Sequence, residues 1–164
     1  MLKNVKGKKI IDFILTGDVD TDDDVIDFMS DFTLLAIQLD DKYIIFESVE
    51  QYSKICISKS SNLSFHERLD DDCQKAQISL INLLIINGEV SDVTIDKIML
   101  YNCEANNDKI ICEAAKILLS NGQIFFFDPS NFWGFTIGGE LVEKNWLDSM
   151  QRKKDFNYEV ITIT

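Results

Sequence analysis

Carboxylates are the most abundant reactive side chains in this sequence. Seven aspartates lie between residues 18 and 31, at Asp18, Asp20, Asp22, Asp23, Asp24, Asp27 and Asp31, and a second cluster comprises Asp70, Asp71 and Asp72. Aspartates at every second position suggest a calcium loop, which needs Gly at position 6 and a bidentate Glu at position 12. A loop that begins at Asp18 has Asp23 and Met29 at these positions. A loop that begins at Asp20 also fails, so the sequence predicts no dedicated metal site.

Nucleophilic catalysis has little support. The sequence contains one histidine, His66, which every Ser–His or Cys–His pair would have to share. It has no GxSxG motif, and Gly138-Gly139 is a turn signal and not a phosphate-binding loop. Paired carboxylates leave a hydrolase open as the least favoured alternative. We therefore expect a protein that is not an enzyme and that uses no cofactor.

The charge of the chain indicates the kind of partner. The formal net charge is -12, and the segment from Asp12 to Glu50 holds 12 acidic residues and one lysine, which is a net -11. Nucleic acids and anionic membranes both attract basic surfaces, so this chain is expected to bind neither. A carboxylate-rich surface instead favours association with a basic protein. We therefore predict that both aspartate clusters face such a partner.

Aromatic residues are concentrated near the C-terminus. Phe125-Phe126-Phe127 is expected to lie in the core, whereas Phe132 and Trp133 follow Pro129 in a predicted loop. Core packing remains an alternative for these two residues as well. Tryptophan is enriched at binding hot spots. Phe132 or Trp133 is therefore a candidate anchor for a protein partner.

The cysteines and the N-terminal residues indicate the cellular compartment in which the protein is expected. Cys56, Cys73, Cys103 and Cys112 are widely spaced without a CxxC pair, which favours free thiols, although a Cys103–Cys112 disulfide across a hairpin is an alternative. The apolar stretch after the basic N-terminus is too short for a signal peptide, because Asp12 interrupts it. No run reaches the roughly 18 apolar residues of a membrane helix. We expect a cytoplasmic protein.

Local patterns predict the elements that position these residues. Strands are predicted at 33–39, 43–48, 55–58, 93–103, 123–128, 135–137 and 158–164, and helices at 25–32 and 140–154. Asp18–Asp24 is predicted as a loop or as the acidic start of the first helix. Residues 76–86 and 109–120 fit either a helix or a strand. Asn121-Gly122, between two apolar runs, predicts a hairpin.

These elements together predict an α+β fold. We expect a single domain over residues 1–164, with a mainly antiparallel sheet of about six strands and two to four helices. The length is sufficient for one core. The final strand is expected to form an exposed sheet edge.

Two passages of the sequence carry a resemblance to a known group of proteins. They are the acidic segment Asp18–Asp31 and the sequence QIFFFDPSNFWGFTIGGELVEKNWLDSM at Gln123–Met150. In these passages the chain loosely resembles bacterial immunity proteins that accompany polymorphic or contact-dependent growth inhibition toxins. The resemblance implies a tight one-to-one complex with a cognate toxin domain in the cytoplasm, a basic nuclease being the expected target. It implies binding through charge or through strand addition at a sheet edge.

The main alternative is a regulatory module that binds another basic protein. Such a module would bind more weakly, with less selectivity and with a strong dependence on salt.

Overall fold

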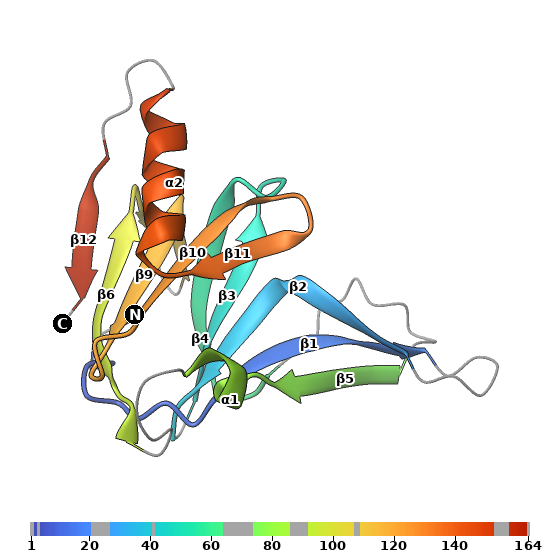
Figure 1. Cartoon of the computed structure of the whole chain (residues 1–164). Helices are drawn as coiled ribbons and strands as arrows, with labels where there is room; N and C mark the ends of the chain where they lie inside the picture. The colour runs from blue at the N-terminus through green and yellow to red at the C-terminus, as the bar shows by residue number, and fades with distance from the viewer. Residues whose placement is uncertain are drawn as a thin grey trace.

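In the computed structural model of the chain, two antiparallel sheets pack face to face and a helix covers the outer face of one of them (Figure 1). The structure describes residues 2, 4–20, 27–40, 42–63, 74–85, 92–106, 109–152 and 158–163.

The larger sheet has seven strands and the smaller has five. In spatial order the larger sheet contains β5 (Gln74–Ser79), β1 (Asp12–Asp20), β2 (Asp27–Gln38), β3 (Tyr43–Val49), β4 (Lys54–Ser60), β8 (Lys109–Cys112) and β7 (Glu104–Asn106). The smaller sheet contains β11 (Gly134–Gly138), β10 (Ile124–Asn131), β9 (Ala114–Leu119), β6 (Ile95–Tyr101) and β12 (Val160–Ile163). The two helices are α1 (Ile81–Leu84) and α2 (Glu140–Gln151).

The main core lies between the two sheets. Phe46 of β3 stacks on Phe127 of β10 with ring centroids 4.6 Å apart, and Phe13 of β1 meets Phe125 at 5.0 Å. Successive side chains of a strand point to opposite faces, so Phe126 faces the other side of the smaller sheet. There it contacts Trp146 of α2 at 5.7 Å. All three phenylalanines are buried because both faces of β10 are covered.

Helix α2 is fixed to the smaller sheet by apolar and polar contacts. Trp146 and Met150 are buried against Tyr101, Ala114 and Phe126. Beside this cluster the Tyr101 hydroxyl donates to Glu143 Oε1 at 2.5 Å, and Lys116 Nζ lies 2.7 Å from Glu143 Oε2. No side chain caps the helix at its N-cap, Gly139. Its position is therefore determined mainly by tertiary contacts.

The antiparallel character of the fold is confirmed, but the molecule is richer in sheet than the α+β prediction of about six strands. The predicted strands at 33–39, 43–48, 55–58, 93–103 and 135–137, the Asn121-Gly122 hairpin and the long C-terminal helix are all present. The predicted final strand is β12, and it forms an edge of the smaller sheet.

The helix predicted at 25–32 and the strand end predicted at Asp128 are wrong over the described residues, and the two segments left open between helix and strand are now assigned. The predicted helix at 25–32 is instead strand β2 over its described residues, which begin at Asp27, because residues 27–31 pair with β1. The segment 76–86 divides between β5 and the single turn of α1, and 109–120 forms two strands, β8 and β9. Strand β10 also continues through Pro129 to Asn131. Its pairing with β9 ends at Phe127, so the missing N–H of Pro129 removes no hydrogen bond between β10 and β9.

The described cysteines Cys56, Cys103 and Cys112 are free thiols, which confirms the favoured prediction for these three. Burial raises the pKa of Cys112 well above its usual range. Cys73 lies outside the described residues, as does His66. Neither described helix is long and apolar enough to cross a membrane.

Candidate functional site

The turn between β10 and β11 presents the two most exposed aromatic side chains among the described residues. Phe132 is 67% exposed and Trp133 is 77% exposed. Their rings meet edge to face with centroids 5.1 Å apart. The prediction that these residues lie at the surface is confirmed, and their role as a partner anchor stays a prediction.

Short side chains around the turn determine its conformation. Asp128 Oδ1 accepts the backbone N–H of Ser130 at 2.9 Å, and Asn131 Oδ1 accepts that of Trp133 at 3.0 Å. Such contacts two residues ahead favour turns over regular strand. Gly134 then has a φ of +117°, and a Cβ at this position would collide with the backbone of Phe32 in β2. Glycine is therefore required where the turn contacts the other sheet.

Two more aromatic residues lie next to this turn: Tyr52 from the β3–β4 turn, and Phe32 from β2, whose backbone and Cβ approach Gly134. The Tyr52 ring lies 5.5 Å from that of Phe132, and Phe32 lies against Gly134. Phe32 reaches this position because the β1–β2 register shifts between Leu15 and Thr16, which leaves residues 32–34 of β2 without partners in β1. We refer to Phe32, Tyr52, Phe132 and Trp133 as the aromatic cluster. It joins strands that are distant in sequence.

Tyr52 belongs to a strained turn. Glu50, Gln51 and Tyr52 have φ values of 50°, 56° and 64°, and none of them is a glycine. This left-handed conformation costs an L-residue roughly 1–2 kcal/mol. Ser53 helps to close the turn, because its N–H donates to Val49 O at 3.2 Å and its hydroxyl donates to Glu50 O at 2.7 Å. Strain of this kind is common at functional sites.

An ion pair lies beside the same turn. Lys54 Nζ is 3.2 Å from Glu50 Oε2 and 3.8 Å from Glu104 Oε1. The pKa of Lys54 is raised, chiefly by its hydrogen bond to Glu50. Both carboxylates are well exposed, so this side of the cluster carries negative charge toward solvent.

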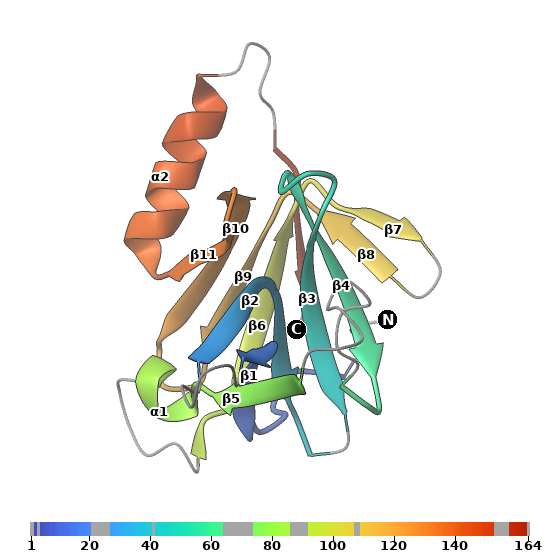
Figure 2. The same ribbon diagram turned by 90° about the vertical axis from the view of Figure 1, so that its right-hand side faces the viewer.

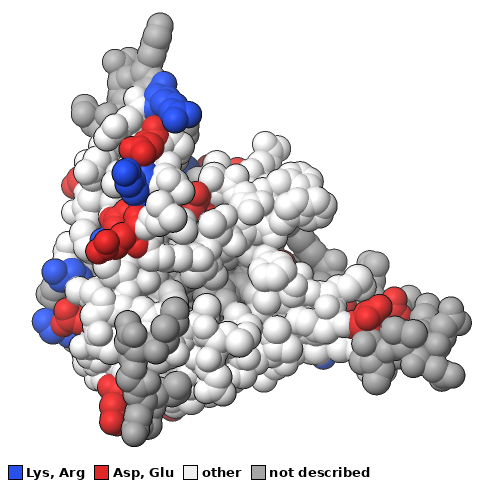
Figure 3. Space-filling model, in the orientation of Figure 1, with Lys and Arg blue, Asp and Glu red and all other residues white. Residues whose placement is uncertain are grey.

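The distribution of charge sets the cluster apart from the rest of the surface. Figure 3 shows an extended face with few charged side chains between α2, which carries both signs, and the acidic far end of the β1–β2 hairpin. Strand β1 contributes Asp18 and Asp20 to that end, and Asp20 lies directly opposite Asp27 of β2. Like charges placed opposite one another destabilise a sheet. An opposing basic surface would relieve this repulsion.

The structure describes only some of the aspartates predicted to bind a partner. Asp18 is partly buried, lies opposite Lys75 of β5, and has one buried carboxylate oxygen with no hydrogen-bond partner among the described groups. Asp20 is exposed. The remaining predicted aspartates, Asp22, Asp23, Asp24, Asp70, Asp71 and Asp72, lie outside the described residues.

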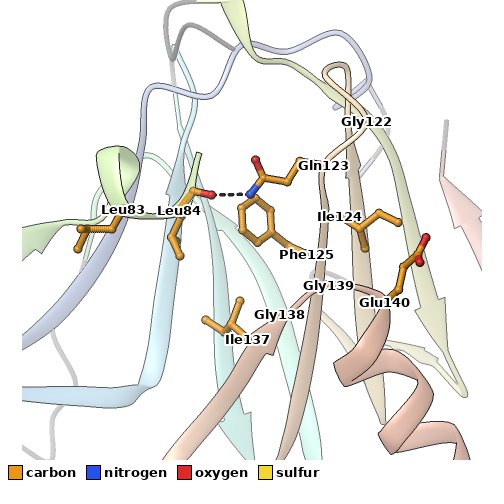
Figure 4. Close-up of a pocket in the computed structure, with 10 residues that line it drawn as sticks. All are labelled: Leu83, Leu84, Gly122, Gln123, Ile124, Phe125, Ile137, Gly138, Gly139 and Glu140. Atoms are coloured by element: carbon orange, nitrogen blue, oxygen red, sulfur yellow. Dashed lines mark hydrogen bonds between the residues drawn. The ribbon is translucent and has the colours of Figure 1, made fainter. Parts of the chain in front are cut away.

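A second feature is an apolar cavity of about 420 Å³ between α1 and the β10–β11 ribbon (Figure 4). Leu84, Phe125 and Ile137 line it, and Gln123 Nε2, in the turn before β10, donates to Leu84 O of α1 at 2.5 Å. This volume is in the range of small-molecule sites. The described lining contains no histidine, cysteine or lysine, so it offers apolar contact and no nucleophile–base pair.

Sequence reasoning missed Phe32 and Tyr52. The spacing around Phe32 predicts a helix, and Tyr52 follows Glu50-Gln51, which carries no turn signal. A left-handed run without glycine or asparagine has no local signature. No family model matches the sequence, and comparison with curated proteins and with solved structures gives no match either.

Proposed function

We propose that this protein binds a basic protein partner and anchors it on the aromatic cluster. The observation that carries the proposal is the pair Phe132 and Trp133, which are large, exposed and in edge-to-face contact on a turn whose backbone is hydrogen-bonded by Asp128 and Asn131. A rigid aromatic pair loses little conformational freedom when it binds. Exposed tryptophan of this kind is typical of the residues that dominate binding energy.

The charge of the chain supports a basic partner. With a formal net charge of -12 the protein attracts cationic surfaces and repels nucleic acid. A nuclease must be basic where it holds its substrate, so an acidic protein can occupy and block that surface. Together with the resemblance to immunity proteins, this leads us to propose a toxin inhibitor whose target is a nuclease domain.

The first experiment is affinity capture from the producing cell at moderate salt, with mass spectrometry of the retained proteins. We expect one basic protein in a one-to-one amount, whose nuclease activity the purified chain inhibits. Many basic proteins that all elute with salt would indicate a regulatory or merely solvating surface. A single captured protein with no activity to inhibit would refute the inhibitor function and retain the binding function.

Matched variants test the anchor. Trp133→Ala is expected to increase the dissociation rate of the captured protein at least tenfold, because a central aromatic anchor contributes about 2 kcal/mol or more. Leu141→Ala is the control, since Leu141 is 70% exposed and apolar but lies on α2. Equal dissociation rates for the two variants would show that the aromatic cluster is not the interface.

A further inference from the structure

Strand β12 has an open outer edge whose hydrogen-bonding groups can be identified from its register. It pairs with β6 only, with Ile161 opposite Leu100 and Ile163 opposite Ile98. The N–H of Asn102 donates to Glu159 O at 2.9 Å. Hydrogen-bonded pairs alternate along an antiparallel ladder, so Ile161 and Ile163 bond to β6. The N–H and C=O groups of Val160 and Thr162 therefore point away from the sheet.

A second hydrogen bond supports this assignment. Glu113 N donates to Tyr101 O at 2.9 Å, so Tyr101 directs its carbonyl toward β9. Its neighbour Leu100 must then direct its backbone groups toward β12, as the register requires. No described element lies beside β12 on its other side (Figures 1 and 2).

The edge of β12 is also short, with four residues, but it lacks the charge, glycines and register shift found at other described edges. Strand β5 includes Lys75, β7 is only three residues long, and β11 is a short strand with glycine at both ends and a register shift against β10. Charge, shortness and bulges are the usual means of preventing edge-to-edge association. The residues of β12, Val-Ile-Thr-Ile, include no charge, proline or glycine and are in regular register.

The side chains of β12 favour a partner strand of the same kind. Val160 contacts the cluster under α2, whereas Ile163 contacts the core between the sheets. Ile161 points to the same side as Ile163 and is 43% exposed. An apolar side chain at the corresponding position of an added strand would cover it. A basic strand would find no carboxylate within β12 to pair with.

We propose that β12 pairs antiparallel with β12 of a second copy of this chain, which joins the two smaller sheets into one continuous sheet. The twofold axis passes between the two Ile161 residues. Val160 of each copy then lies opposite Thr162 of the other, and these pairs exchange four N–H···O=C hydrogen bonds. Ile161 meets its counterpart across a non-hydrogen-bonded pair, the closest side-chain approach in an antiparallel ladder.

Net charge gives this dimer a distinctive salt dependence. Two chains of formal charge -12 repel at long range, and salt screens this repulsion. The dimer is therefore expected to strengthen as salt increases. A complex with a basic partner, as in the proposed function, weakens under the same change. The two associations are independent, and the sign of their salt dependence separates them.

The test is sedimentation equilibrium of the full chain together with amide hydrogen exchange. A four-residue edge is a small interface, so we expect a dissociation constant on the order of 0.1 mM that decreases several-fold between about 0.05 M and about 0.5 M NaCl. In the dimer the amides of Val160 and Thr162 should exchange about tenfold more slowly than in dilute protein. The amides of Ile161 and Ile163 already bond to β6 and should change far less.

Two variants keep the test specific. Thr162→Pro removes one outward N–H and leaves the ladder to β6 intact, so it should abolish the dimer while retaining a cooperative thermal transition. Thr162→Val retains the N–H and should retain the dimer. A chain that stays monomeric up to millimolar concentration would overturn the proposal. So would a dimer that survives Thr162→Pro, or one in which Val160 and Thr162 exchange at the monomer rate.

Discussion

The contact between Glu143, Lys116 and Tyr101 is expected to contribute substantially to the stability of α2 on its sheet. We predict that Glu143→Gln lowers the free energy of unfolding by about 2 kcal/mol. The side chains of Lys116 and Glu143 are only 17% and 15% exposed, so their ion pair is poorly screened by water. Glutamine still accepts the Tyr101 hydrogen bond, but it leaves the Lys116 ammonium largely buried without a counter-charge.

The magnitude lies between two limits. Removal of one partner from a fully buried ion pair costs about 3–5 kcal/mol, whereas exposed pairs contribute about 0.2–1 kcal/mol. The remaining exposure of Lys116 places the cost between these ranges. For a chain of this length, about 2 kcal/mol corresponds to a decrease in Tm of roughly 4–8 °C.

The assay is thermal and urea unfolding of a double-mutant cycle with Glu143→Gln and Lys116→Met. We expect the double variant to be more stable than Glu143→Gln alone, because the buried ammonium is removed together with its partner. Asp96→Asn is the control, since the Lys6–Asp96 pair is 3.9 Å long and well exposed and should contribute less than about 1 kcal/mol. A cost for Glu143→Gln equal to that of the control, or additive single effects, would refute the reasoning.

Three further predictions follow from individual backbone and side-chain positions. Gln51→Gly should increase the free energy of unfolding by about 1 kcal/mol in urea unfolding, because glycine adopts the left-handed conformation at φ 56° without strain; an unchanged or lower stability would show that the turn is not strained. Gly134→Ala should decrease Tm by several degrees and alter the near-ultraviolet circular dichroism of the aromatic cluster, because its Cβ collides with the backbone of Phe32; a spectrum like that of the wild type would contradict this packing. Burial and the hydrogen bond to Glu143 raise the pKa of Tyr101, so its stabilising effect is complete below the unfolded tyrosine pKa of about 10 and is lost as pH rises beyond it. Tm should therefore fall above about pH 10, and Tyr101→Phe should reduce that slope; an identical slope in the variant would assign the loss to other groups.

Several features of this protein follow from local sequence signals. Asn121-Gly122 predicts the β9–β10 hairpin, and Gly122 supplies a positive φ of 81° in its turn. The spacing of Leu141, Trp146, Leu147 and Met150 predicts an amphipathic helix. Trp146 and Met150 are buried in α2, whereas Leu141 is exposed. Pro129 predicts the loop that carries Phe132 and Trp133, although strand β10 continues through Pro129 to Asn131 before the turn begins. In each case residues within a few positions contain the information.

Other features depend on contacts between distant segments. Phe28, Met29 and Phe32 have a spacing that suits a helix. Residues 27–31 are nevertheless strand, because they pair with β1 and their backbone groups bond to a distant segment. Phe126 packs against helix α2, while Phe125 packs between the two sheets. Because the three residues in this run are identical, their sequence pattern does not show which face each one takes.

The aromatic cluster is the clearest product of tertiary structure. A loop at Phe132 and Trp133 could be predicted from Pro129 in the sequence, and the structure adds the hydrogen bonds of Asp128 and Asn131 and the positive φ of Gly134. Only the packing of the two sheets placed Tyr52 and Phe32 against that turn. The sequence likewise determined the net charge, whereas β-sheet register decided which backbone groups of β12 remain open. The physical reason is that register and sheet packing minimise the free energy of the whole chain, so short segments do not encode them.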